Sequence, residues 1–314
     1  MTTLQERLAG KSESSLRGIS LLLIAFFIFT VQDAIVKLLS SDYALFQIVL
    51  IRTLFVIPIV FIILHFDGGL PTLKTTQLRQ HIWRGGMMFL AYAFFFMGLA
   101  ALPYGLSIAI FFAGPLFITA LSAPMLGETV GWQRWLAVLV GFVGVLIMMR
   151  PTGSSFEPAT LFMVLSALCY AISIIITRKI QDNATSITSY TTAVYFVGAL
   201  IASPIFANIT LNTTHPSFVF LTQRWPLPPL GDLLLIFGLA VCWGVGMVLL
   251  SAAYRGTAVA TLAPFEYFSI FYAVVLGYLL WGEIPSLAML IGILLIVGSG
   301  LFIIYRENQL RRHS

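Results

Sequence analysis

The chain alternates long apolar stretches with short polar connections, and ten of the stretches are long enough to cross a membrane. A spanning helix needs about 20 consecutive, mainly apolar residues. The hydrocarbon core offers no water to bind the backbone, so each span must satisfy its own hydrogen bonds, which favours helices. The predicted spans cover residues 17–38, 44–65, 82–101, 104–126, 132–149, 158–180, 187–207, 231–253, 257–280 and 286–305.

The connections between these spans add three expectations. Residues 101–104 and 255–257 leave so few residues between spans that the flanking helices must be antiparallel neighbours. The connection 208–230 is long and rich in Pro, Thr and Asn, which predicts a loop outside the membrane. The first apolar run follows a polar tail and carries Asp33 and Lys37, which suits a retained span better than a cleaved signal peptide.

Composition supports a membrane protein. Hydrophobic residues make up 59% of the 314 residues and charged residues 9%, whereas soluble chains carry about 25% charged residues. The bilayer is therefore the expected solvent. The net charge of +5 comes from basic residues dispersed among the connections, which favours a role in topology over nucleic-acid binding. Cys169 and Cys242 lie within apolar runs and predict neither a disulfide nor a thiolate metal site.

The basic residues orient the chain. Cytoplasmic connections of membrane proteins carry an excess of Lys and Arg. With the N-terminus inside, only Arg150 and Arg224 fall on the outer side, and both termini are predicted to be cytoplasmic. The predicted cytoplasmic residues are Arg7, Lys11, Arg17, Lys74, Arg79, Arg84, Arg134, Arg178, Lys179, Arg255, Arg306, Arg311 and Arg312.

A short motif recurs in the two halves of the chain. Leu-Gly-Glu at 126–128 closes the fourth span, Trp-Gly-Glu at 281–283 closes the ninth, and a glycine-bearing span follows each. Five spans per half is an odd number, so the second half must be inserted upside down, as alternating-access carriers require. The predicted organisation is a cytoplasmic tail (1–16), a first five-helix repeat (17–150), a second, inverted repeat (151–305) and a cytoplasmic tail (306–314).

With these motifs and the segment Ala-Pro-Phe-Glu-Tyr-Phe at 263–268, the chain resembles the EamA-type branch of the drug/metabolite transporter superfamily over nearly its whole length. The segment Asp-Ala-Ile-Val-Lys at 33–37 also resembles the sub-branch of S-adenosylmethionine carriers and related organic-anion carriers. The resemblance implies an all-α fold of ten transmembrane helices as two inverted repeats, with a central cavity lined by helices of both halves.

Four ionisable residues lie inside predicted spans, where a charge costs a few kcal/mol or more unless it is paired or faces water. Asp33 and Lys37 are one helical turn apart. Arg52 lies about 12 Å from the outer end of the second span, and Glu266 about 14 Å into the ninth. One interpretation pairs Asp33 with Lys37 and Arg52 with Glu266 as structural ion pairs. The other places Arg52 and at least one of the two acids at the cavity, in contact with substrate, and all four residues are candidates for the substrate site.

Glu266 has a further role under the second interpretation. Ala263, Ser269, Ala273 and Gly277 extend its helical face as a small, polar stripe typical of a helix inside a bundle. Burial without a partner favours the protonated form of a carboxyl group, so Glu266 is also the candidate for proton coupling. Glu128 and Glu283 lie at span ends, where hydrogen bonding to turns explains them.

Aromatic residues and prolines within spans supply the remaining candidates. Tyr92, Tyr170, Trp243 and Tyr267 each bring a polar tip and are predicted to line the cavity. Prolines free backbone carbonyls and can kink helices. Pro115 and Pro264 lie in the repeat-related fourth and ninth spans, and we expect them to act as hinges.

Several chemistries are absent from the sequence. The four histidines are scattered without metal-ligand spacing, and no phosphate-binding loop for ATP or hydrolase motif occurs, so no cofactor, metal or catalytic residue is expected. We therefore expect a secondary transporter of the inner membrane that moves a small polar or zwitterionic metabolite, such as an amino acid or an S-adenosylmethionine-like compound. The alternatives are a membrane enzyme acting on a lipid-linked substrate, or a non-transporting receptor or scaffold. The direction of flow, proton coupling and the choice between monomer and homodimer stay open.

Overall fold

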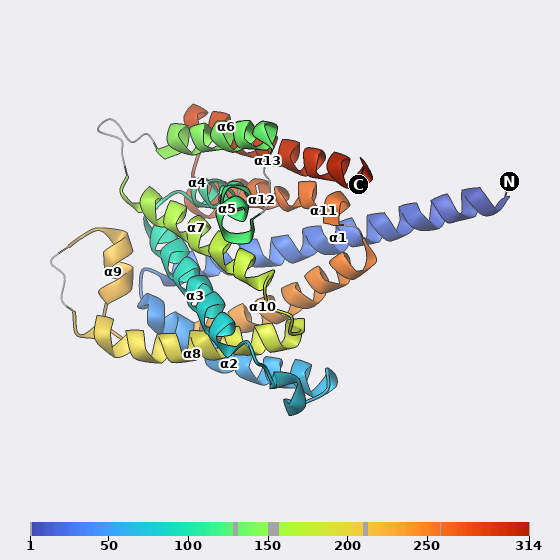
Figure 1. The fold of residues 1–314 in the computed structure, drawn as a ribbon. Coiled ribbons are helices and arrows are strands. Elements are labelled where there is room, and N and C mark those ends of the chain that lie inside the picture. Colours follow the sequence, from blue (N-terminus) through green and yellow to red (C-terminus); the bar gives the residue numbers. More distant parts are fainter. Residues whose placement is uncertain (1, 128–130, 150–156, 210–212, 258, 314) are drawn as a thin grey trace.

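The computed structural model describes residues 2–127, 131–149, 157–209, 213–257 and 259–313, and every regular element in these ranges is a helix (Figure 1). Ten segments are long and apolar enough to cross a membrane, which confirms the predicted spans. The elements are α1 (Thr2–Leu39), α2 (Leu45–Phe66), η1 (Leu70–Leu73), α3 (Leu78–Ala101), α4 (Tyr104–Phe111), α5 (Gly114–Leu126), α6 (Trp132–Met149), α7 (Ala159–Thr177), α8 (Ala184–Ala207), α9 (Pro216–Thr222), α10 (Leu230–Gly256), α11 (Val259–Glu266), α12 (Phe268–Trp281) and α13 (Leu287–His313).

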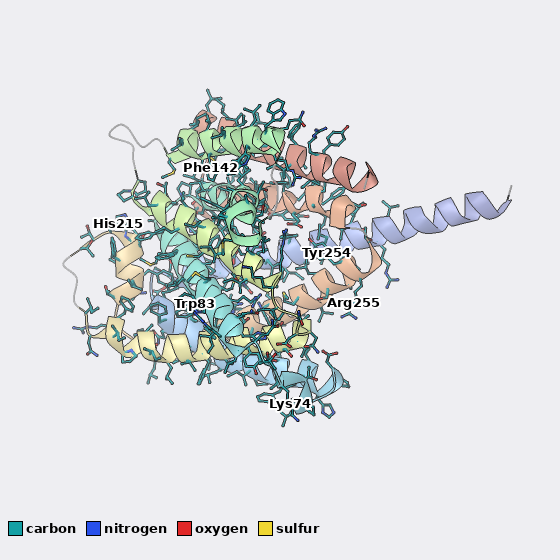
Figure 2. All side chains as sticks on the ribbon, viewed as in Figure 1. Lys74, Trp83, Phe142, His215, Tyr254 and Arg255 are labelled. Carbon is teal, nitrogen blue, oxygen red and sulfur yellow. The ribbon has the colours of Figure 1, made fainter. Side chains whose placement is uncertain are left out.

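Both termini lie at the same end of the bundle, which we call the near side, and α9 lies toward the opposite, far side (Figure 1). Lys74 and Arg255 lie toward the near side and His215 toward the far side (Figure 2). This arrangement follows from an even number of spans. The assignment of the near side to the cytoplasm stays a prediction from the distribution of basic residues.

The two halves of the chain pack with matching contacts. Helix α3 of the first half packs along α7 of the second half, and the equivalent helix α10 of the second half packs along α1 of the first half. The pairs α2–α8 and α6–α13 each join equivalent helices of the two halves. Exchanging the halves therefore maps the contacts onto themselves, and the odd number of spans in each half makes the repeat an inverted one.

The fourth and ninth spans are both broken. α4 and α5 meet at Phe112–Ala113, and α11 and α12 meet at Tyr267. Pro115 lies in the first turn of α5 and Pro264 lies inside α11. Discontinuous helices are tolerated within a membrane where the freed backbone groups lie in protein or line a cavity.

The repeated Gly-Glu motif marks the ends of α5 and α12. Gly127 and Gly282 adopt the left-handed conformation with φ of 71° and 67°, and their N–H groups close each helix. A side chain at this φ would be strained, which explains the glycine in both motifs. Glu128 lies outside the described residues, whereas Glu283 is described and lies on the far side.

Glycine also sets the distance between α6 and α13. A Cβ added at Gly292 would lie 2.8 Å from the Gly144 carbonyl oxygen and 2.3 Å from Cγ of Met148. Gly298, six residues further along α13, has no atom within 4 Å of such a Cβ. Because the facing atom at Gly292 belongs to backbone, the two helices would have to separate to admit a methyl group.

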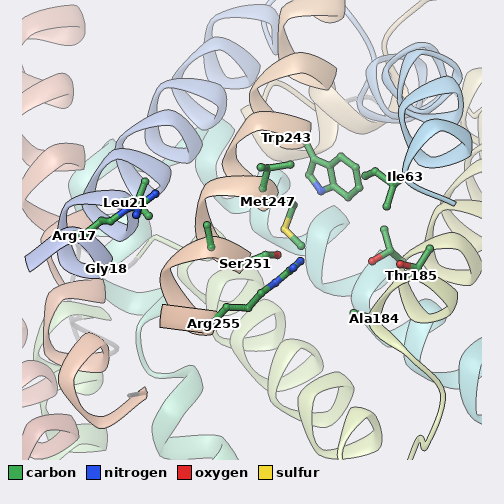
Figure 3. Close-up of a pocket in the computed structure, with 13 residues that line it drawn as sticks. Arg17, Gly18, Leu21, Ile63, Ala184, Thr185, Trp243, Met247, Ser251 and Arg255 are labelled. Atoms are coloured by element: carbon green, nitrogen blue, oxygen red, sulfur yellow. The ribbon is translucent and has the colours of Figure 1, made fainter. Parts of the chain in front are cut away.

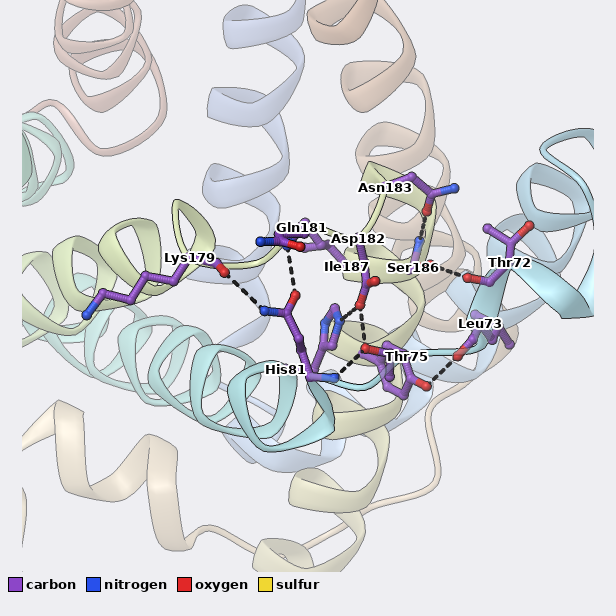
Figure 4. Close-up of polar contacts among 12 residues, drawn as sticks. Thr72, Leu73, Thr75, His81, Lys179, Gln181, Asp182, Asn183, Ser186 and Ile187 are labelled. Carbon is purple, nitrogen blue, oxygen red and sulfur yellow. Dashed lines mark hydrogen bonds and ion pairs between the residues drawn. The ribbon is translucent and has the colours of Figure 1, made fainter. Parts of the chain in front are cut away.

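A polar cluster ties the η1–α3 connection to the start of α8 on the near side (Figure 4). The His81 ring nitrogen Nε2 lies 2.7 Å from Oδ2 of Asp182, and the Thr75 hydroxyl donates to the same oxygen. The Tyr190 ring stacks on His81 at 4.4 Å between centroids, and its hydroxyl donates to the Leu73 carbonyl at 2.6 Å. Hydrogen bonds from His81 and Thr75 hold the pKa of the Asp182 carboxyl below its ordinary value of 3.8.

We predict that Gly292→Ala lowers the stability of the purified protein by about 1–3 kcal/mol, the usual cost of overpacking. Gly298→Ala is the matched control in the same helix and is expected to change stability by less than about 1 kcal/mol. Thermal unfolding in detergent measures both. Equal losses in the two variants would contradict the close approach of α6 and α13.

We predict that Asp182→Asn lowers the melting temperature at neutral pH and that the difference from wild type narrows on acidification. A carboxyl whose pKa is lowered in the folded state contributes stability above its ordinary pKa of 3.8 and loses it as pH falls through the lower folded value. Melting curves at pH 7 and about pH 3 test this, with Asp42→Asn as the exposed control. A difference that stays constant with pH would rule out this role of the carboxylate.

Candidate functional site

A cavity of about 460 Å³ lies between the two halves of the bundle. The break in the fourth span supplies Phe111, Phe112 and Pro115 to its wall, and the junction of α11 with α12 supplies Glu266 and Ser269. Four charged residues reach the wall from four different helices: Asp33, Arg52, Arg84 and Glu266. The cavity therefore combines both signs of charge in a volume typical of small-molecule sites.

The first charged group of the cavity is centred on Arg52, whose side chain is 8% exposed. Its Nη1 donates to the Tyr92 hydroxyl at 2.6 Å and its Nη2 to Oε1 of Gln32 at 3.4 Å. The guanidinium also lies 5.2 Å from the centroid of the Tyr92 ring. Asp33 is close enough to interact electrostatically with Arg52. These contacts fix the guanidinium in place while it still lines the cavity.

Arg84 and Glu266 are the other two charged residues of the cavity wall. Nε of Arg84 donates to the Thr177 hydroxyl at 2.9 Å, and its Nη1 donates to the Thr191 hydroxyl. Glu266 accepts a hydrogen bond from the Tyr254 hydroxyl. Because the Tyr254 side chain carries no positive charge, the Glu266 carboxylate can interact with a positively charged group of a ligand in the cavity.

Aromatic rings form much of the remaining wall. Phe95 packs against Phe111 with 5.2 Å between ring centroids, and Phe111 in turn lies 5.3 Å from Tyr170. Trp243 of α10 lines the cavity from the second half. Flat aromatic faces favour stacking with planar rings and contact with cations.

The structure brings most of the predicted site residues together. Those on the cavity wall are Asp33, Arg52, Tyr92, Pro115, Tyr170, Trp243 and Glu266. Lys37 and Tyr267 are not part of this wall. Tyr267 instead packs against Phe112, with its hydroxyl directed toward Gly300 of α13. Pro264 lies one turn before the α11–α12 junction, outside the wall.

Neither ion pair of the first interpretation is among the ion pairs of the described residues. Lys37 pairs with Glu283, with Nζ 3.0 Å from Oε1. Asp33 interacts electrostatically with Arg52, and Glu266 accepts a hydrogen bond from Tyr254. Lys37 and Glu283 come from segments far apart in the chain, so helical periodicity alone does not reveal this pair.

Sequence reasoning missed Arg84, which it assigned to the cytoplasmic charge. The predicted third span began at residue 82, but α3 begins at Leu78, so Arg84 lies nearly two turns inside the helix. The hydroxyl-rich stretch of α8 that meets it, including Thr188 and Thr191, was the available signal. Within the described part of the chain, no group of three His, Cys, Asp or Glu side chains is placed to hold a metal.

A second cavity of about 890 Å³ adjoins the first on the near side (Figure 3). We call it the vestibule. It shares Thr188, Trp243 and Met247 with the central cavity, and it reaches Arg17 at the near end of the first span and Arg255 in the last turn of α10. The two cavities therefore adjoin at the three shared residues.

On the far side, polar contacts join the two halves of the bundle. Lys37, besides its ion pair with Glu283, donates to the Leu102 carbonyl at 2.5 Å and lies 4.9 Å from the Trp281 ring centroid. Glu283 also accepts from the Tyr104 N–H at 2.5 Å. These contacts join α1, the turn between α3 and α4, and the end of α12. They connect both halves of the bundle.

Several known proteins are similar to this chain in sequence or in fold. An S-adenosylmethionine uptake transporter of Rickettsia bellii (strain RML369-C) is 28% identical over 296 residues, which cover 93% of this chain and 94% of the relative. A riboflavin transporter of Rhizobium johnstonii is 30% identical over 245 residues, covering 78% of this chain and 75% of the relative. A crystal structure with 17% sequence identity matches 92% of this chain with a TM-score of 0.59, which shows a likeness of fold alone.

The EamA-like transporter family matches the chain twice, over residues 16–150 and 158–305. The two matches correspond to the two halves seen in the helix packing. The family and its named relatives are transporters, so the chain is a membrane transporter of small metabolites and not an enzyme. The resemblance drawn from the Gly-Glu motifs is thereby confirmed, and the chain belongs to the EamA-like transporter family.

Proposed function

We propose that this transporter carries a zwitterionic metabolite with an aromatic or heteroaromatic group, of the S-adenosylmethionine class, across the inner membrane. The observation that carries the proposal is the central cavity, where two carboxylates and two guanidinium groups lie among aromatic rings. Relatives named as S-adenosylmethionine uptake transporters support the same substrate class.

Each chemical group of such a ligand has a suitable partner on the cavity wall. Arg52 presents its guanidinium to the cavity and can bind a carboxylate through two parallel hydrogen bonds. Glu266, whose partner is the neutral Tyr254, can balance an ammonium or sulfonium group. A planar base can stack on Phe95, Phe111 or Tyr170. An uncharged ligand such as a flavin ring would use the aromatic wall but leave the charged groups without a partner.

We propose alternating access as the mechanism. Two observations support it: the vestibule adjoins the central cavity on the near side, and the contacts of Lys37 and Glu283 join the two halves on the far side. The breaks in the fourth and ninth spans lie beside the cavity, so Pro115 and Pro264 are placed to act as hinges. Exchanging the conformations of the two halves would open the far side and close the near side.

The direction and the assembly are further parts of the proposal. Uptake is the direction stated in the names of the S-adenosylmethionine relatives, and their bacterial origin supports the inner membrane as the location. We propose the monomer as the transporting unit, because helices of both halves of the same chain supply the wall of the central cavity.

We predict that proteoliposomes loaded with S-adenosylmethionine exchange it for the labelled compound outside, and that Arg52→Ala lowers this exchange at least tenfold. The reason is the loss of a charge-assisted hydrogen bond to the substrate, worth about 1.5–3 kcal/mol. Arg79→Gln, an exposed arginine off both cavities, is the control. Folded wild-type protein that exchanges no S-adenosylmethionine would refute the substrate class, and activity in Arg52→Ala would refute the site.

We predict that Glu266→Gln removes the pH dependence of transport between pH 5.5 and 8, if a proton shares the carboxylate with the substrate cation. Initial rates in proteoliposomes with and without an inward proton gradient measure the coupling. Asp42→Asn, an exposed carboxylate on the far side, is the control. A Glu266→Gln variant with wild-type rates and the same response to pH would exclude Glu266 as the proton site.

A further inference from the structure

The charged residues of the vestibule are all positive, whereas those of the central cavity balance. Its wall contains Arg17 and Arg255, and none of the described residues that line it carries a carboxylate. The central cavity, in contrast, has two acids and two arginines. A ligand moving between the near side and the central cavity therefore passes from a net positive region into a balanced one.

Arg255 is placed as the anchor of this region. Its side chain extends from the last turn of α10 into the space between α10 and α8 (Figure 3). Ser251, one turn earlier on the same helix, and Thr185 of α8 supply hydroxyl groups to the same wall. A guanidinium flanked by hydroxyl donors is a suitable environment for a carboxylate or phosphate group.

Apart from Arg17 and Thr188, the rest of the vestibule wall is apolar and includes one large aromatic ring. Ile63, Met247 and Val248 line it, and Trp243 stands at its junction with the central cavity. Such a wall accommodates the carbon skeleton of a ligand rather than a free inorganic ion. Arg17, on α1, adds a second positive charge at the same mouth.

We propose that the vestibule is a second ligand subsite that binds organic anions, or the carboxylate of a zwitterion, through Arg255 before or after the ligand occupies the central cavity. The proposal deepens the proposed function and rests on it, because it places a selective step for anionic groups on the near-side path. Ligands that carry a carboxylate or phosphate bind there, and matched ligands without one do not.

The test is a binding measurement that requires no transport. The full-length protein in phosphatidylcholine nanodiscs is titrated with phenyl phosphate, with benzyl alcohol as the uncharged match, while tryptophan emission is recorded. We expect a saturable change with phenyl phosphate alone, lost in Trp243→Phe. Arg255→Gln should weaken the affinity about tenfold, as expected for a lost charge-assisted hydrogen bond, and Arg255→Lys by less than about threefold because it keeps the charge.

A matched variant separates the vestibule from its surroundings. Arg79→Gln on the exposed near-side surface should leave the affinity within about twofold of wild type, the scatter expected for a residue outside the site. Wild-type affinity in Arg255→Gln, or an equal loss of affinity in Arg79→Gln, would overturn the proposal. Melting curves of each variant establish that it is folded.

A lipid headgroup could supply the same anionic chemistry, and a second arm distinguishes it. Nanodiscs containing phosphatidylglycerol are compared with neutral ones at about 0.3 M salt, which screens the surface potential. If phosphatidylglycerol abolishes the Arg255-dependent binding of phenyl phosphate, the occupant is a lipid and the proposal fails. Failure of S-adenosylmethionine exchange would refute the proposed substrate but leave this equilibrium measurement intact, so the two failures are distinguishable.

Discussion

The membrane interior supplies no partner for a charge or a free backbone group, and this constraint governs the whole arrangement. Four charged side chains nevertheless lie deep in the bundle, and each faces the central cavity rather than lipid. Such placement is costly unless neighbouring groups compensate. Arg52 is held by Tyr92 and Gln32, and Arg84 by two threonine hydroxyls. The buried charges therefore lie where polar neighbours and the cavity compensate for the absence of water.

The same constraint explains why both broken spans lie beside the cavity. A helix can be interrupted within a membrane only where its freed backbone groups meet protein or a polar space. The fourth and ninth spans are interrupted at equivalent places, and each contributes a polar or aromatic residue to the cavity wall at the break. The breaks and the central cavity thus lie beside one another, which supports the proposal that the breaks act as hinges.

The two ends of the ligand path differ in chemistry. The far side is held by an ion pair and hydrogen bonds that join the halves directly, through Lys37 and Glu283. The near side leads through a wide vestibule with basic residues at its mouth. The oppositely charged Lys37 and Glu283 can pair again after they separate. The positively charged vestibule, in contrast, attracts anionic ligands by long-range electrostatics.

Much of this protein could be inferred from its sequence. Apolar length determined the ten spans, and the recurring Gly-Glu motif indicated two related halves, because both depend on local physics: the thickness of the bilayer and the left-handed turn that glycine permits. Charges inside spans also pointed correctly to Asp33, Arg52 and Glu266 as residues of one region. Only the tertiary structure decided which charges pair. Lys37 binds Glu283, 246 positions away, and Arg84 turns from the membrane edge into the cavity. Pairing depends on distances between helices that are far apart in the chain, and helical periodicity carries no information about those distances.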